Sequence, residues 1–173
     1  MKIAFTDFET TGLRPDWHEI IEIGCVVFDN DTFEIIDTLD AKVRPIYPQR
    51  IDPKAQAVNG FIEKAWKDAP GAHETWRRYA EITDGAHFMA QNVTFDWGFF
   101  TETIKMHPNI GFGLHYHRLD LMSMAYAKMP GLKSYSLKSL CAKTGVAPEP
   151  AIHRAINGAM AGYEVYKALM SNV

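Results

Sequence analysis

The stretch KIAFTDFETTGL, residues 2–13, decides how the rest of the chain is interpreted. Its first half combines aromatic and β-branched residues in alternation, a pattern typical of a buried strand. Alternate side chains of a strand share a face, so Asp7 and Glu9 point the same way. The pair then runs into the segment TTG, which is suited to a ligand-binding backbone turn. An isolated Asp-x-Glu is more often structural than functional, but its position at the end of a buried strand favours a site.

The sequence downstream alternates strand and helix signals. Strands are predicted at 19–29 and 32–45, joined by a turn at 29–31. The remaining patterns predict, in order, a helix at 53–60, a helix at 73–84, a strand at 86–91, a helix at 95–106, a strand at 115–121, a helix at 134–145 and a helix at 153–170. Three adjacent antiparallel-type strands followed by alternating helices and strands predict an α/β domain with a mixed five-stranded sheet flanked by helices. A ligand is then expected at the ends of the central strands.

Length and composition limit the class of protein. The 173 residues are expected to form one domain, 1–173, and the chain has no run of about 18 apolar residues that could span a bilayer. The N-terminus has no export-signal pattern, and Cys25 and Cys141 sit in apolar patterns that predict small buried side chains rather than a disulfide. We therefore expect a cytoplasmic protein without membrane contacts.

The net charge of −3 argues against a protein that holds nucleic acid through a bulk positive field. It does not exclude a nuclease, because a site built from carboxylates lowers the net charge by itself. Oxygen-only ligands such as Asp7 and Glu9 select hard cations, Mg²⁺ or Mn²⁺, over Zn²⁺. Magnesium in turn indicates phosphate chemistry.

Two later residues are candidate partners of the carboxylate pair. Asp96 follows the strand predicted at 86–91, and taken alone it is better explained as a helix cap. His153 opens the last predicted helix, where a surface or capping histidine is the simpler interpretation. Neither residue is a specific signal without the other motifs.

Three motifs together resemble the DnaQ-like 3′→5′ exonucleases, the histidine-bearing (DEDDh) branch of the DEDD superfamily. They are FTDFETTGL, NVTFD with two following aromatics, and a late H-x-A, and they lie in the family's order across nearly the whole chain. Softer similarities are VNGF, RLDLMSMA and YSLKSLCAKTGV. The resemblance implies a ribonuclease H-like fold and a two-metal hydrolase that removes nucleotides from the 3′ end of DNA or RNA, with single-stranded ends the expected substrate. It also implies a possible polymerase or other replication or repair partner.

The resemblance assigns roles to four catalytic residues. Asp7 would contact both Mg²⁺ or Mn²⁺ ions, Glu9 would help to hold the first, and Asp96 would support the second through water. His153 would take a proton from the attacking water, a task suited to an imidazole with an ordinary pKa near 6.5.

The same resemblance predicts a nucleotide-binding set. Thr10 and the backbone through Leu13 would hold the terminal nucleotide, with Leu13 wedged against its base, and the second motif contributes further candidates. The predicted substrate-binding residues are Thr10, Thr11, Gly12, Leu13, Asn92, Phe99 and Phe100.

One position departs from the family pattern. The last motif places an Asp, a ligand of the first metal, where this chain has Gly158. Asn157 is a poor substitute, because one helical step turns a side chain by about 100° and an amide binds a dication more weakly than a carboxylate. Three interpretations stay open: a natural enzyme with a degraded site, a catalytically silent nucleic-acid-binding or regulatory module, and a deliberately inactivated enzyme. The leading hypothesis is a 3′→5′ exonuclease with impaired activity.

Overall fold

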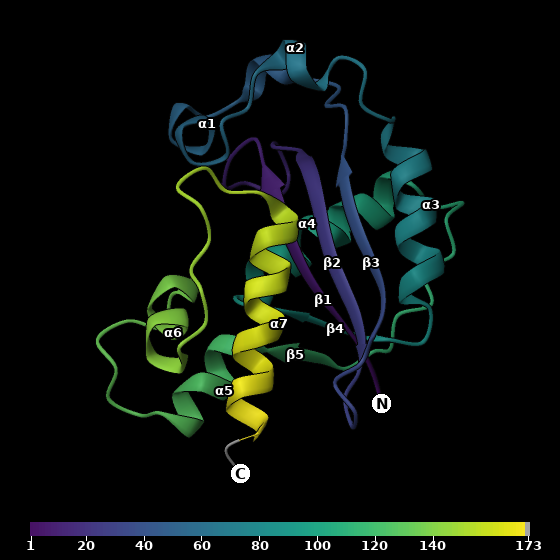
Figure 1. Ribbon diagram of the computed structural model, residues 1–173. Coiled ribbons are helices and arrows are strands. Elements are labelled where there is room, and N and C mark those ends of the chain that lie inside the picture. The colour runs from purple at the N-terminus through teal and green to yellow at the C-terminus, as the bar shows by residue number, and fades with distance from the viewer. Residues whose placement is uncertain (172–173) are drawn as a thin grey trace.

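The computed structural model describes residues 1–171 and contains one mixed five-stranded sheet in the order β3-β2-β1-β4-β5 (Figure 1). The antiparallel part joins β1 to β2 and β2 to β3, whereas β4 and β5 run parallel to β1. The strands are β1 (Lys2–Thr10), β2 (Ile20–Asp29), β3 (Ile35–Lys42), β4 (His87–Ala90) and β5 (Arg118–Asp120). This confirms the predicted mixed α/β sheet.

Seven α-helices and one 3₁₀ turn connect and cover these strands within the described chain. They are η1 (Pro48–Arg50), α1 (Pro53–Asn59), α2 (Glu63–Trp66), α3 (Ala72–Thr83), α4 (Val93–Met106), α5 (Leu121–Lys128), α6 (Leu137–Thr144) and α7 (Ala155–Ser171). The sequence interpretation missed α2 and α5. The first has only four residues, and the second begins directly after β5, where the Asp120 side chain caps it by accepting a hydrogen bond from the Ser123 amide at 2.9 Å. The strand expected at 115–121 is therefore shortened to three residues.

The two faces of the sheet carry separate hydrophobic cores. Helices α3 and α4 pack on one face, around residues such as Phe8, Trp76 and Phe100. Helices α5, α6 and α7 pack on the other, where Phe5 and Tyr166 lie in the core. Figure 1 shows α7 crossing in front of the sheet while α4 lies behind it. Strands β1, β2 and β4 are thus mostly buried, whereas β3 is partly exposed, and the ends of the central strands are the places where polar groups can gather.

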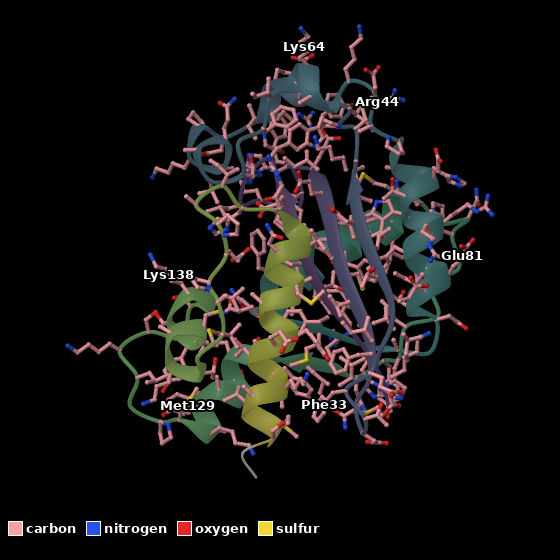
Figure 2. The ribbon with its side chains drawn as sticks, viewed as in Figure 1. Phe33, Arg44, Lys64, Glu81, Met129 and Lys138 are labelled. Atoms are coloured by element: carbon pink, nitrogen blue, oxygen red, sulfur yellow. The ribbon has the colours of Figure 1, made fainter. Side chains whose placement is uncertain are left out.

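Helix α7 is held against the sheet near its start and at its middle. Near its start it approaches β2 so closely that a Cβ at Gly24 would lie 2.0 Å from the Ala155 carbonyl oxygen. At the middle of the helix, the Tyr163 hydroxyl donates to the carbonyl of Phe33 at 2.6 Å, in the β2–β3 turn, where Figure 2 labels Phe33. This tight docking fixes the position of the segment that precedes α7.

The two cysteines lie in the hydrophobic cores on the two faces of the sheet. Cys25 and Cys141 are free and buried, as predicted. None of the helices in residues 1–171 has both the length and the hydropathy that a membrane span needs.

Candidate active site

A cleft with a volume of about 440 Å³ lies at the C-terminal end of β1, where this strand meets α1 and the segment before α7. It brings together Asp7, Glu9 and His153, three of the four predicted catalytic residues. The lining residues are Asp7, Phe8, Glu9, Thr10, Gly12, Leu13, Asp52, Lys54, Ala55, Val58, Asn59, Phe95, Glu149 and His153. The strand alternation therefore places both carboxylates of β1 in one cavity.

Asp96 reaches the same region from the first turn of α4. Its side chain is only 5% exposed, and Oδ1 accepts a hydrogen bond from the Phe8 backbone amide at 3.2 Å. Phe8 lies between Asp7 and Glu9 in β1, so this bond ties the start of α4 to the strand that carries the pair. Asp96 is thus close to the pair, although the lining of the cleft itself does not include it.

His153 precedes α7 instead of opening it, because the helix begins at Ala155. Its backbone amide donates to the Val58 carbonyl of α1 at 3.0 Å, and its side chain is 44% exposed. The adjacent Arg154 donates to the Asn59 carbonyl at 2.5 Å and lies 3.5 Å from a carboxylate oxygen of Glu22. These contacts hold the segment against the sheet while the imidazole stays accessible from the cleft.

The carboxylates of the site repel one another. Burial raises the pKa of Asp7 well above its usual value, and the negative charges of Asp96, Glu9, Glu149 and Glu22 raise this pKa further. Burial, followed by the charge of Glu22, raises the pKa of Glu9 to about 8. For Asp96, burial raises the pKa to about 7, against the stabilising hydrogen bond from Phe8. Such a set of crowded oxygen donors fits a hard divalent cation, which would relieve the repulsion.

Gly158 faces Asp7 directly. A Cβ built on Gly158 would lie 2.5 Å from Asp7 Oδ2 and 2.7 Å from Asp7 Cγ. Position 158, buried on the inner side of the first turns of α7, is therefore beside the carboxylate that the resemblance assigns to both metals. The Asp7 side chain occupies the space that a side chain at 158 would take.

The turn after β1 forms one wall of the cleft. Thr10 and Gly12 line it, and the Thr10 hydroxyl donates to the Gly12 carbonyl at 2.7 Å. Leu13 lines it too and is 79% exposed. Thr11 is fully buried behind this wall, where its hydroxyl accepts from the Glu19 amide at 2.9 Å. Its position supports the turn and does not face the cleft.

The structure does not place Phe99 and Phe100 in the cleft, where the sequence had predicted them. Phe99 and Phe100 are 2% and 1% exposed and belong to the core between α4 and the sheet, so neither lines this cleft. The aromatic residue in the cleft is Phe95, one helical turn closer to the start of α4 than Phe99. Asn92, the residue before α4, is exposed, and the lining of the cleft does not include it.

Glu149 is a site residue that the sequence interpretation missed. Its side chain is 13% exposed, it lines the cleft, and one oxygen lies 4.0 Å from His153 Nδ1. Burial raises its pKa, and the charge of His153 opposes this effect. A single Glu between two prolines in a loop gives no periodic signal that could have identified it.

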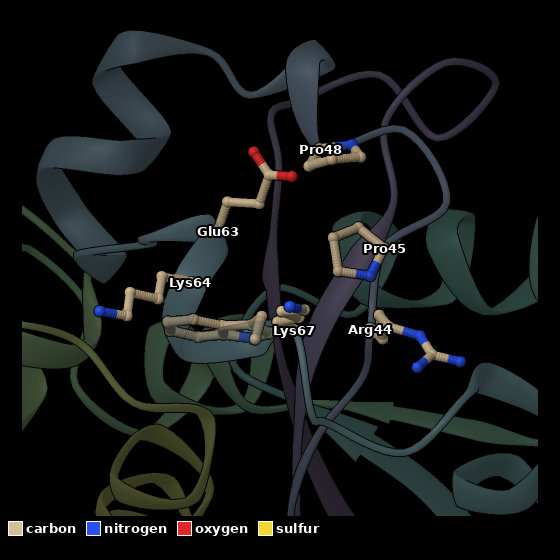
Figure 3. Close-up of a pocket in the computed structure, with 7 residues that line it drawn as sticks. Arg44, Pro45, Pro48, Glu63, Lys64 and Lys67 are labelled. Atoms are coloured by element: carbon tan, nitrogen blue, oxygen red, sulfur yellow. The ribbon is translucent and has the colours of Figure 1, made fainter.

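A second cavity of about 420 Å³ lies beside α2. Its lining includes Arg44, Lys64 and Lys67, but these charged side chains do not converge on one point. Figure 3 shows the Arg44 and Lys64 side chains directed away from each other, with the Glu63 carboxylate pointing in a third direction, toward Pro48. Because the charged groups diverge, this cavity has no convergent set of ligands.

The fold and the site define a ribonuclease H-like domain with a carboxylate-lined cleft. Solved structures share this fold across almost the entire chain. Escherichia coli Exonuclease I in complex with a dA16 oligonucleotide superposes with a TM-score of 0.81 at 18% identity, covering 98% of this chain and 41% of that one. The nuclease domain of 3′hExo, described as a DEDDh family member bound to rAMP, gives 0.75 at 17% identity, covering 99% and 92%.

The family follows from sequence similarity. The RNase_T family model, described as Exonuclease, matches residues 4–166, and this chain belongs to that family, in its DnaQ-like branch. The DNA polymerase III subunit epsilon of Treponema pallidum is 30% identical over 179 residues, covering 98% of this chain and 78% of the relative. The PolC-type DNA polymerase III of Thermotoga maritima is 30% identical over 161 residues, covering 92% of this chain, which spans only 11% of that relative's length.

The raised pKa values predict an unusual dependence of stability on pH. Glu9 and Asp96 bind protons more tightly in the folded chain than in the unfolded one, so the metal-free protein should lose stability as pH rises from about 5 to about 8. Melting temperatures across this range would measure the effect, and Glu9→Gln should make the profile flatter. Millimolar Mn²⁺ should oppose the loss, since metal binding favours the deprotonated carboxylates. A metal-free protein that gains stability over this range would contradict the account.

Proposed function

We propose that this chain is a 3′→5′ exonuclease that hydrolyses terminal phosphodiester bonds of DNA or RNA with two Mg²⁺ or Mn²⁺ ions, and that its activity is impaired at Gly158. The observation that carries the proposal is the gathering of Asp7, Glu9, Asp96 and His153 around one cleft in a member of an exonuclease family. The second candidate, a silent nucleic-acid-binding module, rests on Gly158 alone.

The residues of the site would divide the work as follows. Asp7, Glu9 and Asp96 would hold the cations, whose charge stabilises the attacking and departing oxygens of an in-line displacement when they are bound. His153 would accept the proton of the attacking water, and its 44% exposed imidazole can pass that proton to solvent. One oxygen of Glu149 lies 4.0 Å from His153 Nδ1, so the two side chains share this end of the cleft.

The walls of the cleft suit the end of a single strand. Two apolar side chains line the cleft: Leu13, in the turn after β1, and Phe95, in α4. A terminal base can stack against them. Thr10 and Gly12 supply the polar backbone wall, and Lys54 on α1 lies where it can meet a phosphate. A paired duplex end would have to fray before its last nucleotide entered, which favours single-stranded ends.

Glu149 would partly offset the missing carboxylate. Among the carboxylates that line the cleft, Glu149 is the one on the segment before α7. Gly158 lies in the first turn of that helix. Its charge already acts on both Asp7 and Glu9, whose pKa values it raises. From the loop it cannot reproduce the rigid placement of a side chain at 158, so some metal affinity is retained while catalytic geometry is lost.

Glu149→Gln should therefore weaken Mn²⁺ binding by the parent protein about tenfold, since one of the negative charges that attract the ion is removed. Isothermal titration with Mn²⁺ would measure the change. Glu164→Gln, a substitution on α7 outside the cleft, is the matched control. Equal Mn²⁺ affinities of the parent and Glu149→Gln would exclude a role for Glu149 in holding the ion.

Relatives that carry DNA polymerase III names suggest the setting. We propose that this domain acts in the cytoplasm on strand ends produced during replication or repair, in contact with a polymerase or a related partner. Pull-down of a purified polymerase III catalytic subunit by the immobilised chain would test the partner.

The direct test of the proposed activity uses labelled single strands of DNA and of RNA, each with Mn²⁺ and with Mg²⁺. Slow shortening from the 3′ end, abolished by His153→Ala, would support the enzyme. Tight binding of the strands by both the parent and Gly158→Asp, with no hydrolysis by either, would instead establish the silent module.

A further inference from the structure

Three histidines lie close together at the N-terminal ends of β4 and β5, whereas the active site lies at the C-terminal end of β1. His87 is the first residue of β4, and His117 immediately precedes β5, whose first residue, Arg118, pairs with Phe88. His115 lies two residues before His117, with its backbone amide bonded to the Ala86 carbonyl at 2.8 Å. One ring nitrogen from each histidine lies within 4.8 Å of the others. Two segments far apart in sequence thus present three imidazoles at one point.

One of these rings carries an orphaned polar atom. His87 Nδ1 is buried and has no hydrogen-bond partner among residues 1–171, a state that costs free energy unless something binds there. The His87 and His115 rings stack with centroids 4.0 Å apart, and His117 lies 5.0 Å from His115. Aromatic packing accounts for the stacking but leaves this nitrogen unexplained.

We propose that His87, His115 and His117 form a second metal site that binds Zn²⁺ or a similar borderline transition ion and ties β5 to β4. Three imidazoles without a carboxylate favour zinc-like ions over Mg²⁺ or Mn²⁺. Zn–N bonds of about 2.0–2.1 Å in tetrahedral geometry require nitrogens roughly 3.4 Å apart, a separation that lies inside the 4.8 Å limit within which the three ring nitrogens are found. The His117 backbone amide donates to His115 Nδ1 at 3.1 Å. This hydrogen bond is kept if His115 binds the ion through Nε2 and is lost if it binds through Nδ1.

The position of the site gives it a structural purpose. Strand β5 has only three residues and lies at the sheet edge, so its pairing with β4 is short. A metal held by both segments closes the loop between them, which favours the folded state. Ile3, the β1 partner of His87, is four residues from Asp7, or roughly 13 Å along the strand, so this ion would not take part in hydrolysis.

Titration with Zn²⁺, and with Co²⁺ followed by visible absorption, tests the proposal. The measurements use Asp7→Asn as background, because we expect that substitution to weaken metal binding at the cleft that contains Asp7 and Glu9. We expect one tight ion, a raised melting temperature, and an affinity at least about tenfold lower in His117→Ala and His115→Phe. The second variant keeps a stacked ring while removing its nitrogens.

His73→Ala, which removes an exposed histidine on α3, is the control and should bind Zn²⁺ as the background does. Unchanged affinity in both His117→Ala and His115→Phe would overturn the proposal, and so would the absence of saturable binding below about 100 µM Zn²⁺. The test does not depend on nuclease activity, so its result and that of the proposed function are separate.

Discussion

Gly158→Asp should hydrolyse single-stranded ends about a hundredfold faster than the parent chain. The new carboxylate would stand beside Asp7, whose Oδ2 lies 2.5 Å from the position of its Cβ, and would complete the ligands of the first ion. In-line chemistry tolerates little misplacement, because an error on the order of 1 Å can cost about a hundredfold in rate. Single-turnover rates with the same strand and the same Mn²⁺ concentration would measure the gain.

The substitution also forces Asp7 to move, since a contact of 2.5 Å is too close for any side chain at 158. Gly158→Asn makes the same steric demand without the charge and is the matched control. We expect the asparagine variant to stay as slow as the parent. If Gly158→Asp folds equally well and is no faster than Gly158→Asn, the missing-ligand explanation is wrong. High activity of the parent itself would be equally damaging, because it would mean that another group, such as Glu149, completes the site.

Asp7→Asn should have opposite effects with and without metal. In the metal-free protein it removes one of several repelling carboxylates, so the melting temperature should rise. With metal present the parent should be stabilised by about 2.7 kcal/mol at a hundredfold excess over its dissociation constant, or roughly 5–10 °C, and the variant should lose this gain. Combined with Gly158→Asp, it should return hydrolysis to the background rate.

Asp37→Asn is the comparison for this variant, because Asp37 lies on β3 in an exposed ion pair with Arg78. It should leave the Mn²⁺-dependent rise in melting temperature unchanged. Equal Mn²⁺ stabilisation of Asp7→Asn and the parent would place the ion elsewhere and remove the basis of the proposed mechanism.

The parts of the site on regular elements were predictable from sequence. Strand alternation alone puts Asp7 and Glu9 on one face, and the order of strands and helices gives the mixed sheet. The motif resemblance identified position 158, and the structure places it against Asp7. Such features follow from local periodicity and motif order, which a sequence contains directly.

The parts that depend on tertiary packing were not predictable. Phe95 and Phe99 are four residues apart on α4, about 6 Å along the axis, and only the docking of the helix decides that Phe95 faces the cleft while Phe99 is buried. Glu149 enters through a proline-flanked loop whose path no pattern encodes. Similarly, helix α5 was missed because its cap, Asp120, is also the last residue of β5.

The most direct test of the central claim follows a 5′-labelled single strand incubated with Gly158→Asp and Mn²⁺. A 5′ label separates the possible outcomes, since each cut at the 3′ end shortens the labelled product by one nucleotide. The account predicts a ladder of successively shorter products, faint or absent with the parent and lost with His153→Ala. Internal cuts of random size, release of a labelled mononucleotide at the earliest times, or an intact strand with every variant would contradict it.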